Sequence, residues 1–333
     1  MTLDDIGFYT LSNKRAMRVA RDAINAPLQR CELLLTDRCN FRCPYCRKLK
    51  QGYRGDINFN FATYLIRAWA KRNLFAIRFS GGEPTLYEGL LELVGEAESV
   101  GITRIAISTN GSANYDYYAE LVNAGVNDFS FSLDACCAAD GQMMCGVEVD
   151  WNKVLNNIKQ LSRQTYVSAG VVLTELNHTK ALSIITMAND LGVADIRIIP
   201  AAQNGQYLHN LSDKQLPSWI GAHPILKYRI NRALHGQKIR GLSKNDCHKC
   251  YLVLDDMAVV KDYHFPCIIY LREGGAPIGK ISPHMYQERL EWFGLHDSRK
   301  DNICRENCLD VCVQYNNTVN FFRNIQTLET AKE

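Results

Sequence analysis

The sequence predicts an α/β fold, a partial (β/α)6 TIM-like barrel followed by a small Cys-rich domain made of a β-hairpin and a helix. Short apolar runs alternate with amphipathic segments over residues 31–210, which is typical of parallel strands joined by helical crossovers. A change of composition near residues 204–213 marks the end of this pattern, and six of the 13 cysteines come after it. A length of 333 residues also favours two domains over one.

The elements can be placed from the spacing of apolar residues. Residues 13–27 show helical spacing and stop at Pro27, so we expect residues 1–30 to form a helical lead-in. Residues 211–333 are expected to supply linker helices and then the Cys-rich domain. The expected barrel strands are 31–36, 76–80, 104–109, 128–133, 167–173 and 195–200, and the expected helices lie near 61–72, 86–100, 114–124, 151–163 and 178–191.

Composition narrows the class of protein. The formal net charge of +3 gives no large field for nucleic acid or a membrane surface. The first residues contain two acids where a signal peptide needs positive charge, and no apolar run reaches about 18 residues. We therefore expect a cytoplasmic protein. Clustered cysteines in a chain without a secretion signal indicate metal or redox chemistry.

Three cysteines, Cys39, Cys43 and Cys46, directly follow the first expected strand. Thiolates suit zinc or iron–sulfur clusters. A zinc site would normally close with a fourth Cys or His nearby, which this loop lacks. A [4Fe–4S] cluster held by three Cys keeps one iron open for a ligand. A zinc knuckle, or reduced structural thiols, is the alternative.

The Cys-x3-Cys-x2-Cys spacing, with Tyr45 before the third Cys, resembles the signature of the radical S-adenosylmethionine (SAM) enzymes. The resemblance implies that the open iron of the [4Fe–4S] cluster chelates SAM. It also implies reductive cleavage of SAM to a 5′-deoxyadenosyl radical, which abstracts hydrogen from the substrate. A flavodoxin or ferredoxin-type protein is then the expected reductant.

Further expected SAM contacts lie at the ends of the next strands, where βα barrels carry their active sites. The turn Gly81-Gly82-Glu83 resembles the family motif that binds the methionine amine of SAM. Thr109 and Ser132 are expected at the following strand ends, with Asn110 and Asp134 as weaker candidates. Taken singly, such residues are more often helix caps or turn residues.

Two further groups face the expected barrel mouth. Cys136, Cys137 and Cys145 are interpreted either as small buried residues or as hydrogen-atom donors to a substrate radical. Arg78 and Arg197 are candidate substrate ligands if they point inward, and Arg197 pairs with a helix if it points outward.

The late cysteines resemble the auxiliary-cluster extensions of radical SAM enzymes, the twitch and SPASM modules. One auxiliary [4Fe–4S] cluster is expected, with a second, incompletely ligated cluster or a zinc ribbon as alternatives. The candidate ligands are Cys247, Cys250, Cys267 and one of Cys304, Cys308 and Cys312.

The layout also resembles the cyclase family that makes the molybdopterin precursor from GTP. In that family the substrate is contacted by a basic residue on the first strand, a lysine on the fifth strand and arginines after the second-cluster Cys pair. Here these positions correspond to Glu32, to a site near Val167 and to residues 251–254. Arg78 is the only substrate-reading residue that matches, so we do not expect a nucleoside triphosphate as the substrate. The first prediction is radical modification of a peptide or protein side chain. The alternatives are a small molecule such as a nucleoside, sugar or amino acid, or a non-enzymatic iron–sulfur protein, which would not need the Gly-Gly-Glu turn.

Overall fold

The computed structural model describes residues 9–22, 25, 28–201, 211 and 216–330, with side chains as far as residue 325. Contacts divide the chain into two compact units. Unit 1 contains Met1–Leu33, Lys71–Phe75 and Arg240–Glu333, and unit 2 contains Leu34–Ala70 and Ala76–Ile239. The boundaries expected at residues 30 and 210 differ from this division, because the N-terminal segment groups with the C-terminal part and residues 211–239 group with the barrel.

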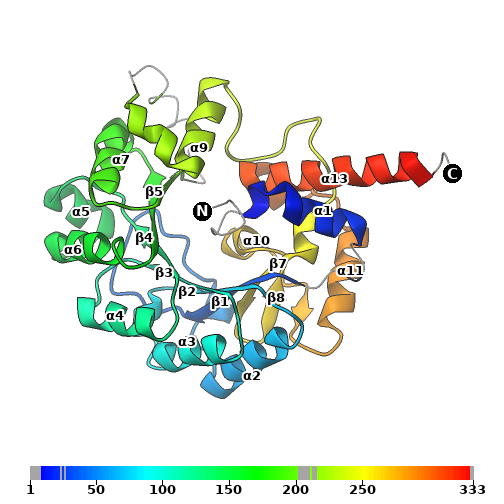
Figure 1. Cartoon of the computed structure of the whole chain (residues 1–333), viewed down its shortest axis with the longest axis horizontal. Coiled ribbons are helices and arrows are strands. Elements are labelled where there is room, and N and C mark those ends of the chain that lie inside the picture. The colour runs from blue at the N-terminus through cyan, green and yellow to red at the C-terminus, as the bar shows by residue number, and fades with distance from the viewer. Residues whose placement is uncertain (1–8, 23–24, 26–27, 202–210, 212–215, 331–333) are drawn as a thin grey trace. The chain divides into compact units, whose positions relative to one another are not determined.

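Unit 2 is built on strands that neighbour one another in chain order, β1 to β6 (Figure 1). The pairs from β2 to β6 are all parallel. This confirms the expected α/β barrel architecture, because parallel neighbours require a crossover helix between successive strands. The strands are β1 (Arg30–Thr36, of which the last three residues belong to unit 2), β2 (Ala76–Gly81), β3 (Arg104–Thr109), β4 (Asp128–Ser132), β5 (Tyr166–Leu173) and β6 (Asp195–Pro200).

Helices cover the outer side of these strands, as Figure 1 shows for α2 to α7. In α6, Val154, Ile158 and Leu161 recur at helical spacing and are fully buried, while Asp150 caps the first turn by accepting from the Lys153 backbone N–H at 3.0 Å. The helices of unit 2 are α2 (Phe59–Ala70), α3 (Leu90–Ser99), α4 (Tyr115–Asn123), α5 (Ala138–Cys145), α6 (Trp151–Leu161), α7 (Ala181–Asp190) and α9 (Pro224–Leu234), with short 3-10 turns at Gln51–Tyr53, Pro84–Leu86, His178–Lys180 and Ser218–Ala222.

Large apolar side chains fill the space between the strands and the helices. Phe129 and Phe131 of β4 are fully buried and meet the ring of Tyr118 edge-on, with ring centroids 5.8 and 5.7 Å apart. Such rings bury about 150–250 Å² each, so they supply much of the hydrophobic stabilisation of the barrel. A rigid core of this kind fixes the strand ends where the candidate site lies.

Unit 1 contains the Cys-rich region. β7 and β8 form the hairpin predicted from the alternating residues 252–260, with Lys261 at a positive φ of 51° in its turn. The elements of unit 1 are the 3-10 turns Tyr9–Leu11 and Tyr251–Leu254, the first part of β1, α1 (Asn13–Arg21), β7 (Asp256–Val260), β8 (Tyr263–Phe265), β9 (Gly279–Lys280), α10 (Ile268–Arg272), α11 (Met285–Leu295), α12 (Asn302–Asn307) and α13 (Asp310–Thr330).

The last cysteines do not lie on one continuous helix. Their spacing predicts a single helical face, but α12 ends at Asn307 and the next residue, Cys308, has φ −55° and ψ 130°. Extended backbone at Cys308 separates α12 from α13, so Cys304 and Cys312 lie on different helices.

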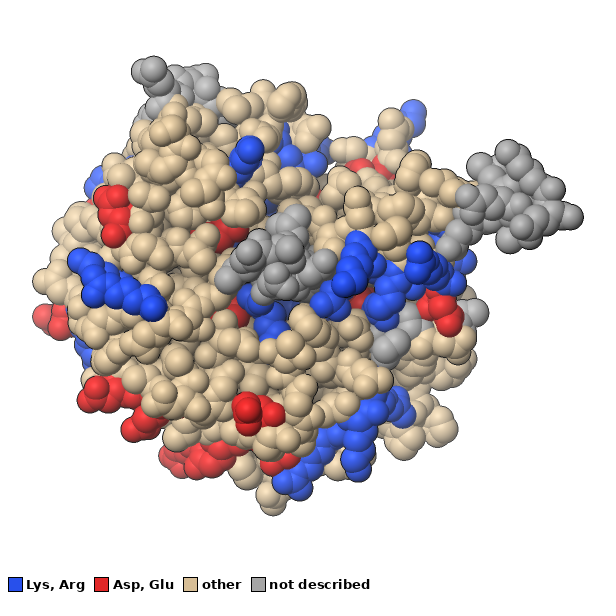
Figure 2. Space-filling view, in the orientation of Figure 1, with Lys and Arg blue, Asp and Glu red and all other residues tan. Residues whose placement is uncertain are grey.

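No helix in the described parts of the chain is long and apolar enough to cross a membrane. Figure 2 shows one face of the protein, on which acidic and basic side chains form small separate groups between larger areas of other residues. This distribution agrees with the small net charge of +3.

Candidate active site

The loop after β1 carries the three cysteines of the expected cluster site. Cys39 and Cys46 are exposed and Cys43 is half-buried. The Phe41 backbone N–H donates to Cys39 Sγ at 3.4 Å, and the Asn110 side-chain amide lies 4.0 Å from the same sulfur. N–H groups that face a cysteine sulfur stabilise the charge of a bound cluster. Burial raises the pKa of Cys43 to about 11, so metal binding there must displace a proton.

A single zinc ion requires closely spaced ligand atoms. Two thiolates on one tetrahedral zinc, each about 2.3 Å from the metal, lie roughly 3.8 Å apart. In the described part of the chain, the only three potential ligands whose donor atoms all lie within 4.8 Å of one another are Cys136, Cys137 and Asp140. The sulfurs of Cys39, Cys43 and Cys46 do not all lie so close together.

The turn after β2 lies directly against this loop. The backbone N–H groups of Gly82 and Glu83 donate to the carbonyl oxygens of Thr36 and Arg38 at 2.7 and 2.8 Å. A Cβ atom on Gly81 would lie 2.2 Å from the Thr36 oxygen, and Gly81 also has a φ of 139°. Only glycine fits so close an approach. The two glycines therefore hold the beginning of the cysteine loop in place through backbone contact.

Glu83 is held in a network of hydrogen bonds at the strand ends. Its carboxylate is buried and accepts four hydrogen bonds, from the backbone and hydroxyl of Thr85 at 3.1 and 2.7 Å, the hydroxyl of Thr109 at 2.7 Å and the backbone of Asn110 at 2.7 Å. Burial raises the pKa of Glu83, and these donors oppose the rise. The carboxylate thereby joins the end of β2 to the end of β3. Its contact with the SAM amine stays a prediction.

The ends of β3 and β4 differ in accessibility. Thr109 is buried, and its hydroxyl contacts that of Tyr118 at 2.8 Å in addition to Glu83. Asn110 donates to Asn40 Oδ1 at 2.8 Å, which ties β3 to the cysteine loop. Ser132 is exposed at the end of β4. Of the two expected hydroxyl contacts, Ser132 is the one open to a ligand.

Tyr45 is fixed to the barrel by its hydroxyl group. It donates to Asp134, just after β4, and the other oxygen of that carboxylate accepts the Val172 backbone N–H of β5 at 2.5 Å. Burial raises the pKa of Asp134 to about 6, and both hydrogen bonds act in the opposite direction. The aromatic residue of the motif is thus held by a buried carboxylate that sequence spacing alone does not pair with it.

The three candidate hydrogen donors do not form one group. Cys136 and Cys137 lie together before α5, whereas Cys145 ends that helix and accepts the Arg42 backbone N–H through its carbonyl at 2.8 Å. Burial, followed by the charge of Cys43, raises the pKa of Cys145 to about 12. Cys145 therefore belongs with the cysteine loop and keeps its proton at neutral pH.

Arg78 is held in a buried ion pair. It donates to Asp128 at 2.9 Å and to the Ser108 hydroxyl at 3.1 Å, and Arg104 donates to the same carboxylate at 2.9 Å. Burial alone would raise the pKa of Asp128, but the charges of Arg78 and Arg104, and then of Arg197, hold it below its ordinary value. Both candidate substrate arginines thus face one buried acid. Their role as substrate ligands stays a prediction.

A pocket of about 220 Å³ opens beside the cysteine loop. Tyr45, Cys46 and Arg47 line one part of it, and Thr174 and Glu175, just after β5, line another. Arg47 and Glu175 were not predicted as site residues, because neither belongs to a recognisable motif. The available signals were the position of Arg47 directly after the cysteine motif and of Glu175 just after a strand end.

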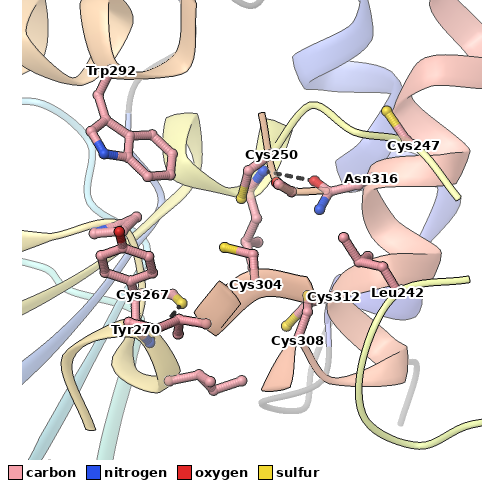
Figure 3. A pocket seen from close by; sticks show the side chains of 15 residues that line it. Leu242, Cys247, Cys250, Cys267, Tyr270, Trp292, Cys304, Cys308, Cys312 and Asn316 are labelled. Atoms are coloured by element: carbon pink, nitrogen blue, oxygen red, sulfur yellow. Dashed lines mark hydrogen bonds between the residues drawn. The ribbon is translucent and has the colours of Figure 1, made fainter. Parts of the chain in front are cut away.

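All six late cysteines line one pocket of unit 1 (Figure 3). Apolar and aromatic side chains, among them Trp292, complete its wall. Six thiols around one apolar cavity are a donor set that fits an iron–sulfur cluster, since soft thiolates select such clusters or zinc. The cysteines are Cys247, Cys250, Cys267, Cys304, Cys308 and Cys312.

The six cysteines are not equivalent. Figure 3 shows Cys250, Cys267 and Cys304 with their sulfurs toward a common space, whereas Cys247 lies beyond Asn316. Burial raises the pKa of Cys304, with the charges of Cys250 and Cys267 as the next causes. Burial also raises the pKa values of Cys250 and Cys267, and the charge of Cys312 adds to both. Cys250 and Cys267 were expected to act with Cys247 and one of the last three cysteines, and this ligand set stays a prediction.

A family model described as the radical SAM superfamily matches residues 33–182. The GTP 3′,8-cyclase of Synechococcus elongatus is 34% identical over 252 residues, which cover 71% of this chain and 73% of that protein. The probable GTP 3′,8-cyclase of Saccharolobus solfataricus is 27% identical over 183 residues, and the match spans 58% of its length.

Solved structures show the same fold at low identity. Native anSMEcpe with bound AdoMet and Cp18Cys peptide superposes with a TM-score of 0.59 at 14% identity, covering 92% of this chain and 99% of that one. Streptococcus suis SuiB bound to S-adenosylmethionine gives 0.57 at 13% identity, covering 90% and 75%. At such identities the likeness concerns the fold alone.

Proposed function

The chain belongs to the radical SAM superfamily, and we propose that Cys39, Cys43 and Cys46 hold the [4Fe–4S] cluster whose remaining iron binds SAM. Enzymes of this superfamily use such a cluster and SAM and depend on a reductant. Bound together, cluster and SAM supply a carbon-centred radical that removes hydrogen from a substrate. The observation that supports this assignment most strongly is the backbone contact between the loop of these cysteines and the Gly81-Gly82 turn.

The residues around the cluster then have separable tasks. Gly82 and Glu83 hold the loop through their backbone N–H groups, and Asn110 places an amide near Cys39. Tyr45, fixed by Asp134, forms a wall of the pocket beside the loop. In this assignment SAM contacts come from the strand ends, where Ser132 is exposed and Thr109 and Glu83 are hydrogen-bonded to each other, and from the backbone of the turn.

We also propose one auxiliary [4Fe–4S] cluster in unit 1. We favour Cys250, Cys267 and Cys304 as ligands because their sulfurs face a common space in the pocket (Figure 3), with Cys308 or Cys312 as the fourth. Four protein ligands would leave no iron open, so this cluster would transfer electrons instead of binding substrate. A zinc ribbon would use the same thiols, and the metal content separates the two.

For the substrate we propose a small molecule such as a nucleoside, sugar or amino acid. The relative that is 34% identical is named for a reaction of GTP, a small molecule, whereas the peptide-bound neighbour shares only the fold. The comparisons therefore do not support the first prediction, a peptide side chain. Glu32 is buried and paired with Arg30 at 3.7 Å, and residues 251–254 are buried and uncharged, which argues against a triphosphate.

The experiment is anaerobic reconstitution followed by reduction and incubation with SAM. We expect about seven to eight irons per chain for two cubane clusters and formation of 5′-deoxyadenosine. A variant with Cys39, Cys43 and Cys46 replaced by Ala should keep about four irons and produce no 5′-deoxyadenosine. Zinc in the loop, or no 5′-deoxyadenosine from fully loaded protein, would overturn the proposal.

The proposed reductant is a flavodoxin or ferredoxin-type protein, and the proposed location is the cytoplasm.

For the substrate, the rate of 5′-deoxyadenosine formation is compared in the presence of nucleoside, sugar and amino acid pools and of peptide pools. A substrate accelerates SAM cleavage. It also exchanges hydrogen with the cleavage product: deuterium passes from a labelled substrate to 5′-deoxyadenosine, or from labelled 5′-deoxyadenosine to the substrate. Stimulation by a small-molecule pool supports the proposed class. Stimulation by peptides alone would restore the peptide interpretation.

A further inference from the structure

Two adjacent thiols and a carboxylate converge just after β4. The donor atoms of Cys136, Cys137 and Asp140 all lie within 4.8 Å of one another. Cys136 Sγ lies 3.7 Å from Asp140 Oδ2. Cys137 is exposed and the other two residues are half-buried, so an ion from solvent can reach all three. None of these side chains belongs to either cysteine cluster site described above.

The spacing matches that of a single tetrahedral ion. With a Zn–S bond of about 2.3 Å and a Zn–O bond of about 2.1 Å, a sulfur and an oxygen on the same zinc lie roughly 3.6 Å apart. The separation of 3.7 Å between Cys136 Sγ and Asp140 Oδ2 is already close to this value. The remaining donor needs at most a side-chain rotation, because all separations are below 4.8 Å.

The carboxylate is held in place from its other side. Lys180 Nζ donates to both oxygens of Asp140 at 2.7 Å. One oxygen can bind a metal while the other keeps the ammonium group, as the outer partners of metal-bound carboxylates commonly do. Asp140 also lies in the first turn of α5, whose hydrogen-bonded backbone fixes its position relative to Cys137, the N-cap.

We propose that Cys136, Cys137 and Asp140 form a mononuclear zinc site that is separate from the iron–sulfur clusters and leaves one coordination position open. Two thiolates and one carboxylate are ligands that zinc accepts, and three protein ligands with an open position are typical of zinc sites that bind a further ligand. The open position would take water or a sulfur, nitrogen or oxygen atom of a substrate at the carboxyl end of β4, the end where βα barrels bind substrates.

This inference competes with the interpretation of Cys136 and Cys137 as hydrogen donors. A zinc-bound thiolate carries no S–H hydrogen, so the metal-loaded protein cannot use these two residues to quench a radical. Cys145, which lies beside the cluster loop and keeps its proton, would then be the remaining candidate donor. The two roles can be separated by measuring zinc and hydrogen donation on the same preparation.

The test uses protein with its iron–sulfur clusters loaded, so that the cluster cysteines are occupied. After dialysis against Zn²⁺ and gel filtration, zinc and iron are counted per chain, and X-ray absorption at the zinc edge gives the ligand shell. We expect one zinc with two sulfur neighbours near 2.3 Å and two lighter ones. Cys136→Ala, Cys137→Ala and Asp140→Asn should each lose zinc and keep the iron content, while Cys31→Ala, a buried thiol of unit 1, should keep both.

Loss of affinity in the three ligand variants should exceed the roughly 10–100-fold that changes in outer partners cause. Unchanged iron content shows that a variant has folded, so a loss of zinc can be assigned to the site. The proposal is wrong if the loaded wild-type protein binds no zinc, if Cys136→Ala binds zinc as wild type does, or if the zinc has three or four sulfur neighbours. None of these results depends on whether SAM is cleaved.

Discussion

Replacement of Gly82 by Ala tests the contact between the β2 turn and the cysteine loop. A Cβ atom at Gly82 would lie 2.1 Å from the Arg38 carbonyl oxygen and 2.7 Å from that of Asp37. Ordinary contact begins near 3.4 Å, so the two backbone segments must separate by about 3.4 − 2.1 = 1.3 Å. Gly82 does not have a positive φ, so alanine is free of backbone strain there and crowding alone causes the effect.

The expected cost follows from what that separation breaks. Two backbone hydrogen bonds, of 2.7 and 2.8 Å, join the turn to the loop, and each is worth about 0.5–1.5 kcal/mol. Overpacking adds about 1–3 kcal/mol, so the total is roughly 2–6 kcal/mol. Because the displaced segment leads directly into Cys39, we expect Gly82→Ala to lose most of the three-Cys cluster after anaerobic reconstitution, which iron analysis measures as a fall of about four irons per chain.

The matched control is Gly95→Ala in the middle of α3. A Cβ atom there meets nothing within 4 Å, so the change should stabilise the helix by about 0.5–1 kcal/mol and leave the iron content unchanged. If Gly82→Ala loaded iron and unfolded at the same temperature as wild type, the close approach of these two segments would not hold the cluster loop.

Three further substitutions test other parts of the account. Asp128→Asn leaves two buried arginines without their shared acid and should cost about 3–5 kcal/mol in denaturant unfolding. Arg67→Ala, which removes an exposed ion pair, should cost far less, and equal losses would refute a buried network. Tyr45→Phe removes a hydrogen-bond donor from the buried Asp134 and should lower the free energy of unfolding by about 1–3 kcal/mol. It should also weaken SAM binding measured by equilibrium dialysis, and unchanged binding would argue against a positioning role for Tyr45. Cys304→Ala should lower the iron content by up to about four per chain while 5′-deoxyadenosine still forms, and full iron retention would remove this residue from the auxiliary ligands.

Much of the barrel could be predicted because its information is local. Each strand is a short apolar run, and each crossover helix except α5 shows a regular apolar stripe. The sequence of α5, from Ala138 to Cys145, has no such stripe and does not predict a helix. Polar and small residues formed a helix there because its ends are held by contacts from elsewhere, including the bond from Arg42 to Cys145.

The candidate site likewise has parts that could be predicted from local sequence and parts that could not. The cysteine loop and the Gly-Gly turn carry recognisable spacing, and both lie where expected. The partners of Glu83, the bond between Tyr45 and Asp134, and the gathering of six late cysteines around one pocket depend on distances between residues far apart in the chain. Motif spacing contains no such information, which is why these partners were not predicted and why Cys304, Cys308 and Cys312 were left as alternatives.

The most direct test of the central assignment is electron paramagnetic resonance of the reduced, reconstituted protein with and without SAM labelled with ¹⁵N in its amino group. Binding of SAM to an open iron predicts a changed cluster spectrum and a nitrogen coupling that disappears when Cys39, Cys43 and Cys46 are replaced by Ala. A spectrum that ignores SAM, with no nitrogen coupling in fully loaded protein, would contradict the assignment.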